Sequence, residues 1–406
     1  MNYIEGGVCA AKGFSANGLN CGINPDKNKN DLCMVYSDVL CNTAAVYTQN
    51  KVKGSPIVVT KRNLALSKGK SQAVIANSKN ANTANADGEQ KAMKMCELTA
   101  KVLGIKPEQV IVAFTGVIGE VLPIEPIEKS IRVLADGLSY SGNAEAVNAI
   151  MTTDTVPKEV AVQFMLDGKL CTIGGMAKGS GMIHPNMATT LNFITTDVAI
   201  TCEMLQKALS ETVITTYNCL TVDGDTSTND MISVMANGLA DNKTIACENE
   251  NYTVFKTALH DVLEKLTIML AKDGEGATKL IECTCSGAKD LSTAITVAKS
   301  VVRSPLVKSG IFGSDANWGR ILCAIGYAEA DFDINKVNVD VSSSAGEIVA
   351  CRNGLVVEFS EEKAKEILSQ DEIYIHINLH DGDSSAKAWG CDLTYDYVRI
   401  NGDYRS

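Results

Sequence analysis

The chain is 406 residues long, which is enough for about two to three domains or one large layered body. Hydrophobic residues make up 45% of it, so a sizeable core is expected. The net charge of −11 argues against nucleic acid or an anionic membrane as a partner. No apolar stretch reaches the length of a membrane span and the first residues show no secretory signal, so we predict a cytoplasmic protein.

Cysteine and histidine usage argues against a metal site and against a histidine base. The 14 cysteines are scattered, which in a long chain without a signal is typical of reduced, buried thiols. The tightest pair, Cys283 and Cys285, has a one-residue gap that suits neither a redox motif nor a usual zinc site. Only 4 histidines occur, so we expect no metal and a catalytic base that is not histidine. No cofactor is expected either.

In the first half of the chain, strand-like and helical patterns alternate. Apolar runs predict strands, and apolar residues at helical spacing predict helices. The predicted elements are a strand at 73–76, a helix at 88–103, a strand at 110–114, a helix at 127–138 and a hairpin at 159–173 that turns at Asp167 and Gly168.

The predicted strand at 110–114 ends at Thr115 and Gly116. A threonine hydroxyl and an adjacent glycine N–H can point at one oxygen, which is what the oxyanion of an acyl transfer needs. A simple strand-terminating turn is the alternative interpretation.

The segment 178–191 carries the most specific signal in the chain. Gly179, Gly181 and Pro185 lie within a few positions of one another. Because glycine permits positive φ and proline fixes φ, we predict an irregular connection between regular elements, which ends at Thr189. If the loop holds the Thr189 hydroxyl against the Ala188 carbonyl, an N→O acyl shift and hydrolysis free a new N-terminus. A free α-amino group titrates near pH 8, so one residue then supplies both nucleophile and base. The alternative is a connection whose threonine caps a helix.

The second half continues with mixed elements. The patterns predict helices at 203–216, 254–272, 288–302 and 361–368, and strands at 337–341, 348–350, 355–359, 373–379 and 388–393. Strands and helices mix without strict β-α-β repetition. We therefore expect a mixed α/β fold, a layered α-β-β-α body in which sheets are covered by helices.

The run Lys-Gly-x-Gly-Met-x-x-Pro-x-Met-Ala-Thr at 178–189 resembles the autoprocessing motif of the ornithine acetyltransferase family, also called glutamate N-acetyltransferases. The resemblance extends over nearly the whole chain. It implies cleavage between Ala188 and Thr189, giving an α chain of residues 1–188 and a β chain of residues 189–406. It also implies the layered α/β body, shared by both chains, and association into an α2β2 heterotetramer.

The same resemblance implies the other site residues. Thr115 and Gly116 would form the oxyanion hole. Substrate would be bound by Thr152 (with Thr153 as the close alternative), Lys178, Thr189, Glu275, Asn401 and Ser406. From the residues alone, Lys178 could equally be a surface lysine, Glu275 could belong to the stop of a helix, and the C-terminal tail could fray.

The resemblance predicts an acyltransferase of arginine biosynthesis. Thr189 would take the acetyl group from N2-acetyl-L-ornithine and pass it to L-glutamate in a ping-pong reaction, and acetyl-CoA is left open as a second donor. One rival interpretation is an amidohydrolase or aminopeptidase with the same N-terminal threonine. The other is a non-catalytic amino-acid-binding protein whose chain stays whole. Feedback by arginine and the final subunit count are also left open by the sequence.

Overall fold

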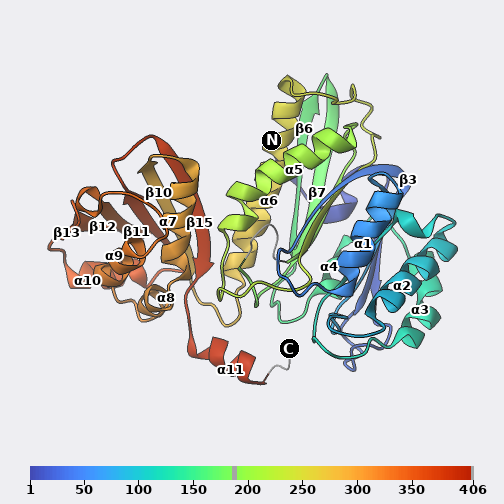
Figure 1. The fold of residues 1–406 in the computed structure, drawn as a ribbon, viewed down its shortest axis with the longest axis horizontal. Helices are drawn as coiled ribbons and strands as arrows, with labels where there is room; N and C mark the ends of the chain where they lie inside the picture. The colour runs from blue at the N-terminus through green and yellow to red at the C-terminus, as the bar shows by residue number, and fades with distance from the viewer. Residues whose placement is uncertain (185–189, 404–406) are drawn as a thin grey trace.

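We analysed a computed structural model of the protein, which describes residues 1–184 and 190–403. The chain forms two lobes of unequal size (Figure 1). The larger lobe is built on a sheet of nine strands and the smaller on a sheet of six. The last helix, α11, runs below the smaller lobe back toward the larger one (Figure 1).

The strands are β1 (Asn2–Ile4), β2 (Phe14–Leu19), β3 (Leu32–Tyr47), β4 (Lys70–Asn77), β5 (Val110–Phe114), β6 (Lys158–Leu166), β7 (Lys169–Lys178), β8 (Leu191–Thr196), β9 (Met231–Ala236), β10 (Leu280–Ala288), β11 (Asn338–Ser343), β12 (Gly346–Arg352), β13 (Leu355–Val356), β14 (Glu372–Asn378) and β15 (Ser384–Cys391). The helices are α1 (Ser55–Leu66), α2 (Gly88–Leu103), α3 (Ile124–Asp136), α4 (Asn143–Ile150), α5 (Cys202–Thr215), α6 (Glu250–Lys272), α7 (Leu291–Arg303), α8 (Pro305–Phe312), α9 (Trp318–Gly326), α10 (Glu361–Leu368) and α11 (Tyr395–Asp403).

The larger sheet has the order β1-β6-β7-β8-β9-β3-β4-β5, with β2 pairing with β3. The pairs β8–β9 and β4–β5 are parallel, and the other pairs are antiparallel. Strands β8 and β9, which come after position 189, lie between β7 and β3, which come before it. The two parts of the chain on either side of Ala188 and Thr189 are therefore interleaved within one sheet.

Both faces of the larger sheet are buried, and alternate residues of a strand pack on opposite faces. In β4, Val74 and Ala76 pack in a buried cluster with residues of α4, whereas Ile75 packs in another with residues of α2. Because successive side chains of a strand point to opposite faces, one strand supplies both clusters. Helix α6 packs on β6 and β7, and α5 packs on β3 and on α6; their buried cluster continues into the smaller lobe.

The smaller sheet has the order β13-β12-β11-β14-β10-β15, with β10 and β14 parallel. Helix α7 packs on β10 and β15. Within the described residues, no helix is long and apolar enough to cross a lipid bilayer.

The predicted mixed α/β fold with helix-covered sheets is confirmed, and so are most local elements. Helix α2 and strand β5 have the predicted bounds, and the predicted hairpin is formed by β6 and β7. Asp167 and Gly168 both have positive φ, at 50° and 74°, as a tight two-residue hairpin turn requires. The strands β1, β2, β3, β8, β9 and β10 and the helices α1, α4, α8 and α11 were not predicted.

Candidate active site

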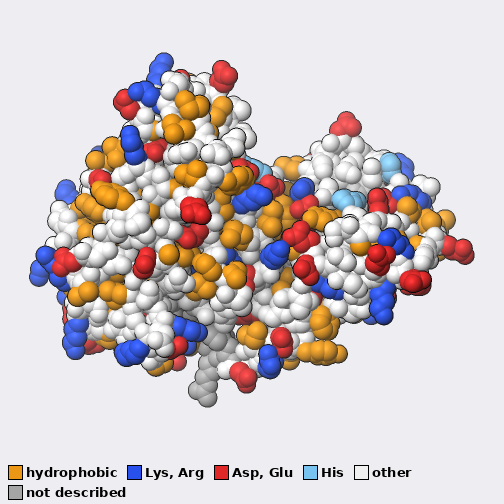
Figure 2. All heavy atoms as spheres, turned by 180° about the vertical axis from the view of Figure 1, so that it is seen from behind, with side chains coloured by type: hydrophobic (Ala, Val, Ile, Leu, Met, Phe, Trp, Pro, Cys, Tyr) orange, Lys and Arg blue, Asp and Glu red, His pale blue; other side chains and the backbone are white. Residues whose placement is uncertain are grey.

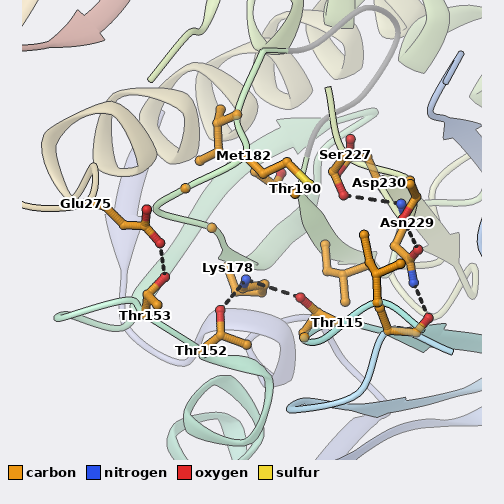
Figure 3. Close-up of a pocket in the computed structure, with 18 of the residues that line it drawn as sticks. Thr115, Thr152, Thr153, Lys178, Met182, Thr190, Ser227, Asn229, Asp230 and Glu275 are labelled. Atoms are coloured by element: carbon orange, nitrogen blue, oxygen red, sulfur yellow. Dashed lines mark hydrogen bonds between the residues drawn. The ribbon is translucent and has the colours of Figure 1, made fainter. Parts of the chain in front are cut away.

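A pocket opens where β7 runs into the segment 178–190 (Figure 3). Its lining comes from the segment after β4, the turn after β5, the segment before β6, the end of β7 and the residues that follow it, the start of β8, the segment before β9, the segment after α6, and α11. The residues that line it are Ala81, Thr115, Gly116, Ile118, Thr152, Thr153, Lys178, Gly179, Gly181, Met182, Ile183, Thr190, Leu191, Ser227, Thr228, Asn229, Asp230, Glu275 and Asn401.

Lys178 is the cation of the pocket. It is the last residue of β7 and pairs in register with Leu191 of β8. Its ammonium group donates to the Thr152 hydroxyl at 2.7 Å and to the Thr115 hydroxyl at 3.3 Å (Figure 3). Burial lowers the pKa of Lys178, and Asp154, whose carboxylate lies 3.8 Å away, opposes that shift.

Behind Lys178 lies a buried chain of charges. Asp154 accepts from the Gly179 backbone N–H at 2.7 Å and from the Lys158 ammonium at 2.7 Å. Lys158 also contacts Asp273 at 2.5 Å. Burial by itself would favour protonated Asp154, but the Lys178 and Lys158 charges outweigh it and hold the pKa of Asp154 well below its usual range. This network fixes the end of β7 and with it the position of Lys178.

We expect Asp154→Asn to lower the free energy of unfolding by about 3–5 kcal/mol at neutral pH, because it leaves two buried ammonium groups without their shared carboxylate. The pKa of Asp154 is depressed in the folded state, so its stabilisation is fully present above the ordinary value of 3.8 and is lost as the pH falls through the lower folded value. Denaturant unfolding of both proteins from pH 7 down to about pH 2, through the window below pH 3.8, measures this.

The matched control is Asp136→Asn, which breaks an exposed ion pair with Arg132 and should change stability little at any pH. A stability difference between Asp154→Asn and the wild type that stays constant into acid would contradict an ionised Asp154.

Glu275 is one of two acidic residues that line the pocket, the other being Asp230. Its carboxylate accepts from the Thr153 hydroxyl and from the Asn401 side-chain amide, each at 2.7 Å. Its backbone N–H donates to the Ser180 carbonyl at 2.8 Å. A Cβ at Gly181 would lie 2.2 Å from a Glu275 oxygen, so the glycine is needed to let the carboxylate approach the loop.

Thr115 and Gly116 follow β5 in a tight turn against another part of the backbone. Gly116 has φ 129°, and a Cβ there would lie 2.1 Å from the carbonyl carbon of Lys79. No residue other than glycine fits without moving one of the two segments. Phe114 before the turn is fully buried, and its carbonyl accepts from the Asn229 side chain at 3.0 Å.

The segment from Gly179 to His184 is held by hydrogen bonds that its backbone N–H groups donate to a side chain. The Asp223 carboxylate accepts from the Met182 N–H at 2.6 Å and from the Ile183 N–H at 2.9 Å. Met182 has φ 54°, a left-handed conformation that these contacts stabilise. Asp223 therefore shapes the chain just before position 185.

Thr190 begins the described chain on the far side of that segment. Its hydroxyl accepts from the Asn192 side chain, whose oxygen accepts from the buried Tyr217 hydroxyl at 2.6 Å. Its carbonyl accepts from the Met231 N–H at 2.9 Å. The side chain of Thr190 is thus part of a buried structural network.

The structure brings together all the described residues that the sequence predicted for the site. These are Thr115, Gly116, Thr152, Lys178, Glu275 and Asn401. Ala188, Thr189 and Ser406 lie outside the described residues. The two threonines of the pair at 152 and 153 face different groups: Thr152 accepts from Lys178, whereas Thr153 donates to Glu275.

Sequence reasoning missed the contribution of Ser227, Asn229 and Asp230. Asp230 is fully buried, and burial raises its pKa well above the usual range. Among the described residues, its Oδ2 has no hydrogen-bond partner. In the sequence these three side chains lie in the polar run at 223–230, and nothing in that run distinguishes them.

Comparison with known proteins identifies the family. A sequence profile of the ArgJ family matches residues 15–406. The chain belongs to the ArgJ family. The arginine biosynthesis bifunctional protein ArgJ 1 of Clostridium acetobutylicum is 51% identical over 394 residues, which cover 97% of this chain and 96% of that protein.

Two solved ArgJ-related chains are also similar. The arginine biosynthesis bifunctional protein argJ of Bacillus halodurans is 48% identical with a TM-score of 0.50, over 52% of this chain and 98% of the solved chain. The ornithine acetyltransferase of Mycobacterium tuberculosis, solved with ornithine, is 33% identical with a TM-score of 0.41, over 46% of this chain and 99% of the solved chain.

Proposed function

We propose that this ArgJ protein is the acetyltransferase of arginine biosynthesis that moves an acetyl group from N2-acetyl-L-ornithine to L-glutamate through Thr189. Membership of the family supports this, since its relatives are named for arginine biosynthesis. The observation that carries the proposal is the pocket itself. Residues from separate segments along the chain converge on it, at the chain position next to Thr189.

The proposed reaction has two halves. The Thr189 amine takes the proton of the Thr189 hydroxyl, and Oγ attacks the acetyl carbonyl of acetylornithine. The C–N bond breaks, the leaving amine receives the proton, and an acetyl ester stays on Thr189. The α-amine of glutamate then attacks the ester and regenerates the hydroxyl. Thr115 and Gly116, at the pocket wall, would donate to the oxyanion in both halves.

The charges in the pocket suit an amino-acid substrate. Lys178 supplies one positive charge, and Glu275 supplies a negative charge from another segment. We assign Lys178 with Thr152 to the substrate carboxylate. We assign Glu275 with Thr153 and Asn401 to a substrate ammonium group, and Ser406 to the same binding set. Charge-assisted hydrogen bonds of this kind orient a small zwitterion strongly.

The interleaved sheet supports the proposed division into chains 1–188 and 189–406. If the backbone is cut between Ala188 and Thr189, β8 remains hydrogen-bonded to β7 and β9 remains hydrogen-bonded to β3. Cleavage therefore need not separate the two pieces. The Bacillus halodurans chain is about half as long as this one, as a cleaved subunit would be. The engagement of Thr190 by Asn192 favours Thr189 as the reactive residue. An α2β2 assembly and a cytoplasmic location are part of the same proposal.

The test is an acetyl-exchange assay combined with mass spectrometry of the purified protein. We expect two fragments that meet at Ala188 and Thr189, and acetylglutamate formed from acetylornithine and glutamate without an added cofactor. Release of free acetate without acetylglutamate would favour the hydrolase interpretation. Ligand binding without turnover by an uncut chain would favour the binding-protein interpretation.

A further inference from the structure

The cut that frees Thr189 needs an acid–base group other than the Thr189 amine. In the cut protein that amine is the base, but before the cut its nitrogen belongs to the Ala188–Thr189 amide and is not basic. The N→O shift must take a proton from the hydroxyl and deliver one to the departing nitrogen. Another group of the pocket therefore has to carry that proton.

Three titratable side chains are found among the described residues that line the pocket: Lys178, Asp230 and Glu275. Both Glu275 oxygens accept hydrogen bonds of 2.7 Å from neighbouring side chains. The Lys178 ammonium donates to two threonine hydroxyls and lies 3.8 Å from Asp154. Asp230 differs from both, because its Oδ2 has no hydrogen-bond partner within the described parts of the chain. Asp230 is thus the lining acid with an oxygen left for proton transfer.

The burial of Asp230 favours the protonated form of its carboxyl group. Figure 2 shows Asp and Glu side chains at the surface of the protein, whereas Asp230 is only 3% exposed. Burial raises the pKa of Asp230 well above its usual range, although hydrogen bonds from Ser227 and Thr190 and the charge of Lys178 oppose the rise. A buried carboxyl that keeps its proton can act as an acid.

Asp230 and Met231 hold the residue that follows the proposed cut. The Thr190 backbone N–H donates to the Asp230 carboxyl, and the Thr190 carbonyl accepts from the Met231 N–H at 2.9 Å. Thr190 has φ 151°, a strained conformation for a β-branched residue. Thr189 lies outside the described residues, but it is bonded to Thr190, and consecutive Cα atoms are about 3.8 Å apart. A carboxyl that contacts the Thr190 amide is therefore within reach of the preceding amide.

We propose that Asp230 is the acid–base residue of the self-cleavage. The Thr189 Oγ bonds to the Ala188 carbonyl carbon, and the C–N bond between the two residues breaks. Asp230 gives its proton to the departing nitrogen and regains the proton that the hydroxyl loses, so its carboxyl ends unchanged. Water then hydrolyses the new ester to the Ala188 carboxylate and the Thr189 hydroxyl. The cut itself rests on the proposed function.

The test follows cleavage of the full chain after cell-free synthesis, with the uncut fraction measured by mass spectrometry over time. Asp230→Asn keeps the size of the side chain and an acceptor oxygen, but it cannot give up a proton in the same way. We expect it to cut about 10²- to 10⁴-fold more slowly than the wild type, the usual loss of an acid–base group.

Asp197→Asn is the matched control. Asp197 is also buried, burial raises its pKa, and it accepts from the backbone N–H groups of Lys12 and Thr172. It follows the other end of β8 and does not line the pocket. We expect this variant to cut within about twofold of the wild-type rate.

The pH dependence of cleavage separates proton transfer from a structural role. If the protonated carboxyl is required, wild-type cleavage slows as the pH rises through the raised pKa of Asp230. Lys178 and Glu275 also line the pocket, and Asp154 lies next to Lys178. All three remain in Asp230→Asn, so a fall that they cause would persist there. We expect the residual cleavage of Asp230→Asn to lack the alkaline fall, and an equal fall in both proteins would overturn the inference.

The remaining outcomes are distinct. Asp230→Asn that folds and cuts at the wild-type rate overturns this inference alone, whereas a wild type that is never cut overturns the proposed function. If circular dichroism shows that Asp230→Asn does not fold, Ser227→Ala decides. The hydrogen bond from Ser227 lowers the pKa of Asp230, so its loss should move the alkaline fall to higher pH. A fall that does not move would count against Asp230.

Discussion

Thr189→Ala is expected to give a single uncut chain of 43.2 kDa with no measurable acetyl exchange. The variant lacks the hydroxyl needed for the N→O shift, so neither the new amine nor the nucleophile is formed. Losing a covalent nucleophile costs a factor on the order of 10⁴ or more in kcat. Mass spectrometry checks the cleavage, and acetylglutamate production from acetylornithine checks the activity.

Two companion variants make this result specific. Thr189→Ser keeps a hydroxyl and should still cut and turn over, although more slowly. Thr190→Ala removes the hydroxyl that accepts from Asn192, so we expect cleavage to continue with a stability loss of about 1 kcal/mol. If Thr190→Ala blocked cleavage and Thr189→Ala did not, the nucleophile would have to be reassigned to Thr190.

Gly116→Ala is expected to lower kcat by about 10²- to 10³-fold, the loss typical of one oxyanion donor. The added Cβ would lie 2.1 Å from the Lys79 carbonyl carbon and 2.5 Å from the Asn80 nitrogen, so the turn must move away from its present position. That movement displaces both the Gly116 N–H and the Thr115 hydroxyl. Steady-state kinetics with acetylornithine and glutamate measure the effect, and KM should change less than kcat.

Gly119→Ala is the matched control, because it separates crowding from backbone strain. Gly119 also has a positive φ, 81°, but a Cβ there would meet nothing within 4 Å. In both variants alanine must adopt a positive φ, which costs about 1 kcal/mol or more. Only in Gly116→Ala does the added Cβ also collide with the backbone. Equal kinetic losses in the two variants would show that the effect is one of general stability and not of the oxyanion hole.

Helices and strands were predictable where the spacing of apolar residues along the chain matched the period of the element that they form. Helix α2 has apolar residues at helical spacing and ends before Gly104, whose φ of 69° suits a glycine. Helix α1 was missed for the opposite reason. Ile57, Val58, Val59 and Thr60 are β-branched residues that favour a strand, and they become helical because α1 packs on α2 and on β5.

Site residues were predictable only where a motif named them. Lys178 and Glu275 stood in glycine-rich segments that matched the family, and both line the pocket. Asp230 and Asn229 lie in a polar run from which no site residue was predicted. Their burial beside Lys178 depends on β9 entering the sheet next to β3, a contact between residues about 190 positions apart along the chain. No local pattern carries that information.

The amino-acid sequence was enough to predict a mixed α/β protein, because that depends on interactions within a few residues, and its motif at 178–189 carries the proposal that the chain is cut before Thr189. The glycines and the proline of the segment 178–191, and the hydroxyl of Thr189 next to the Ala188 carbonyl in sequence, are short-range features. Only the tertiary structure decided that β8 and β9 insert between β7 and β3, and that the Thr152 and Thr153 hydroxyls contact opposite charges. These arrangements come from burying apolar surface between segments distant in the chain, and that burial selects neighbours by overall fit and not by local propensity.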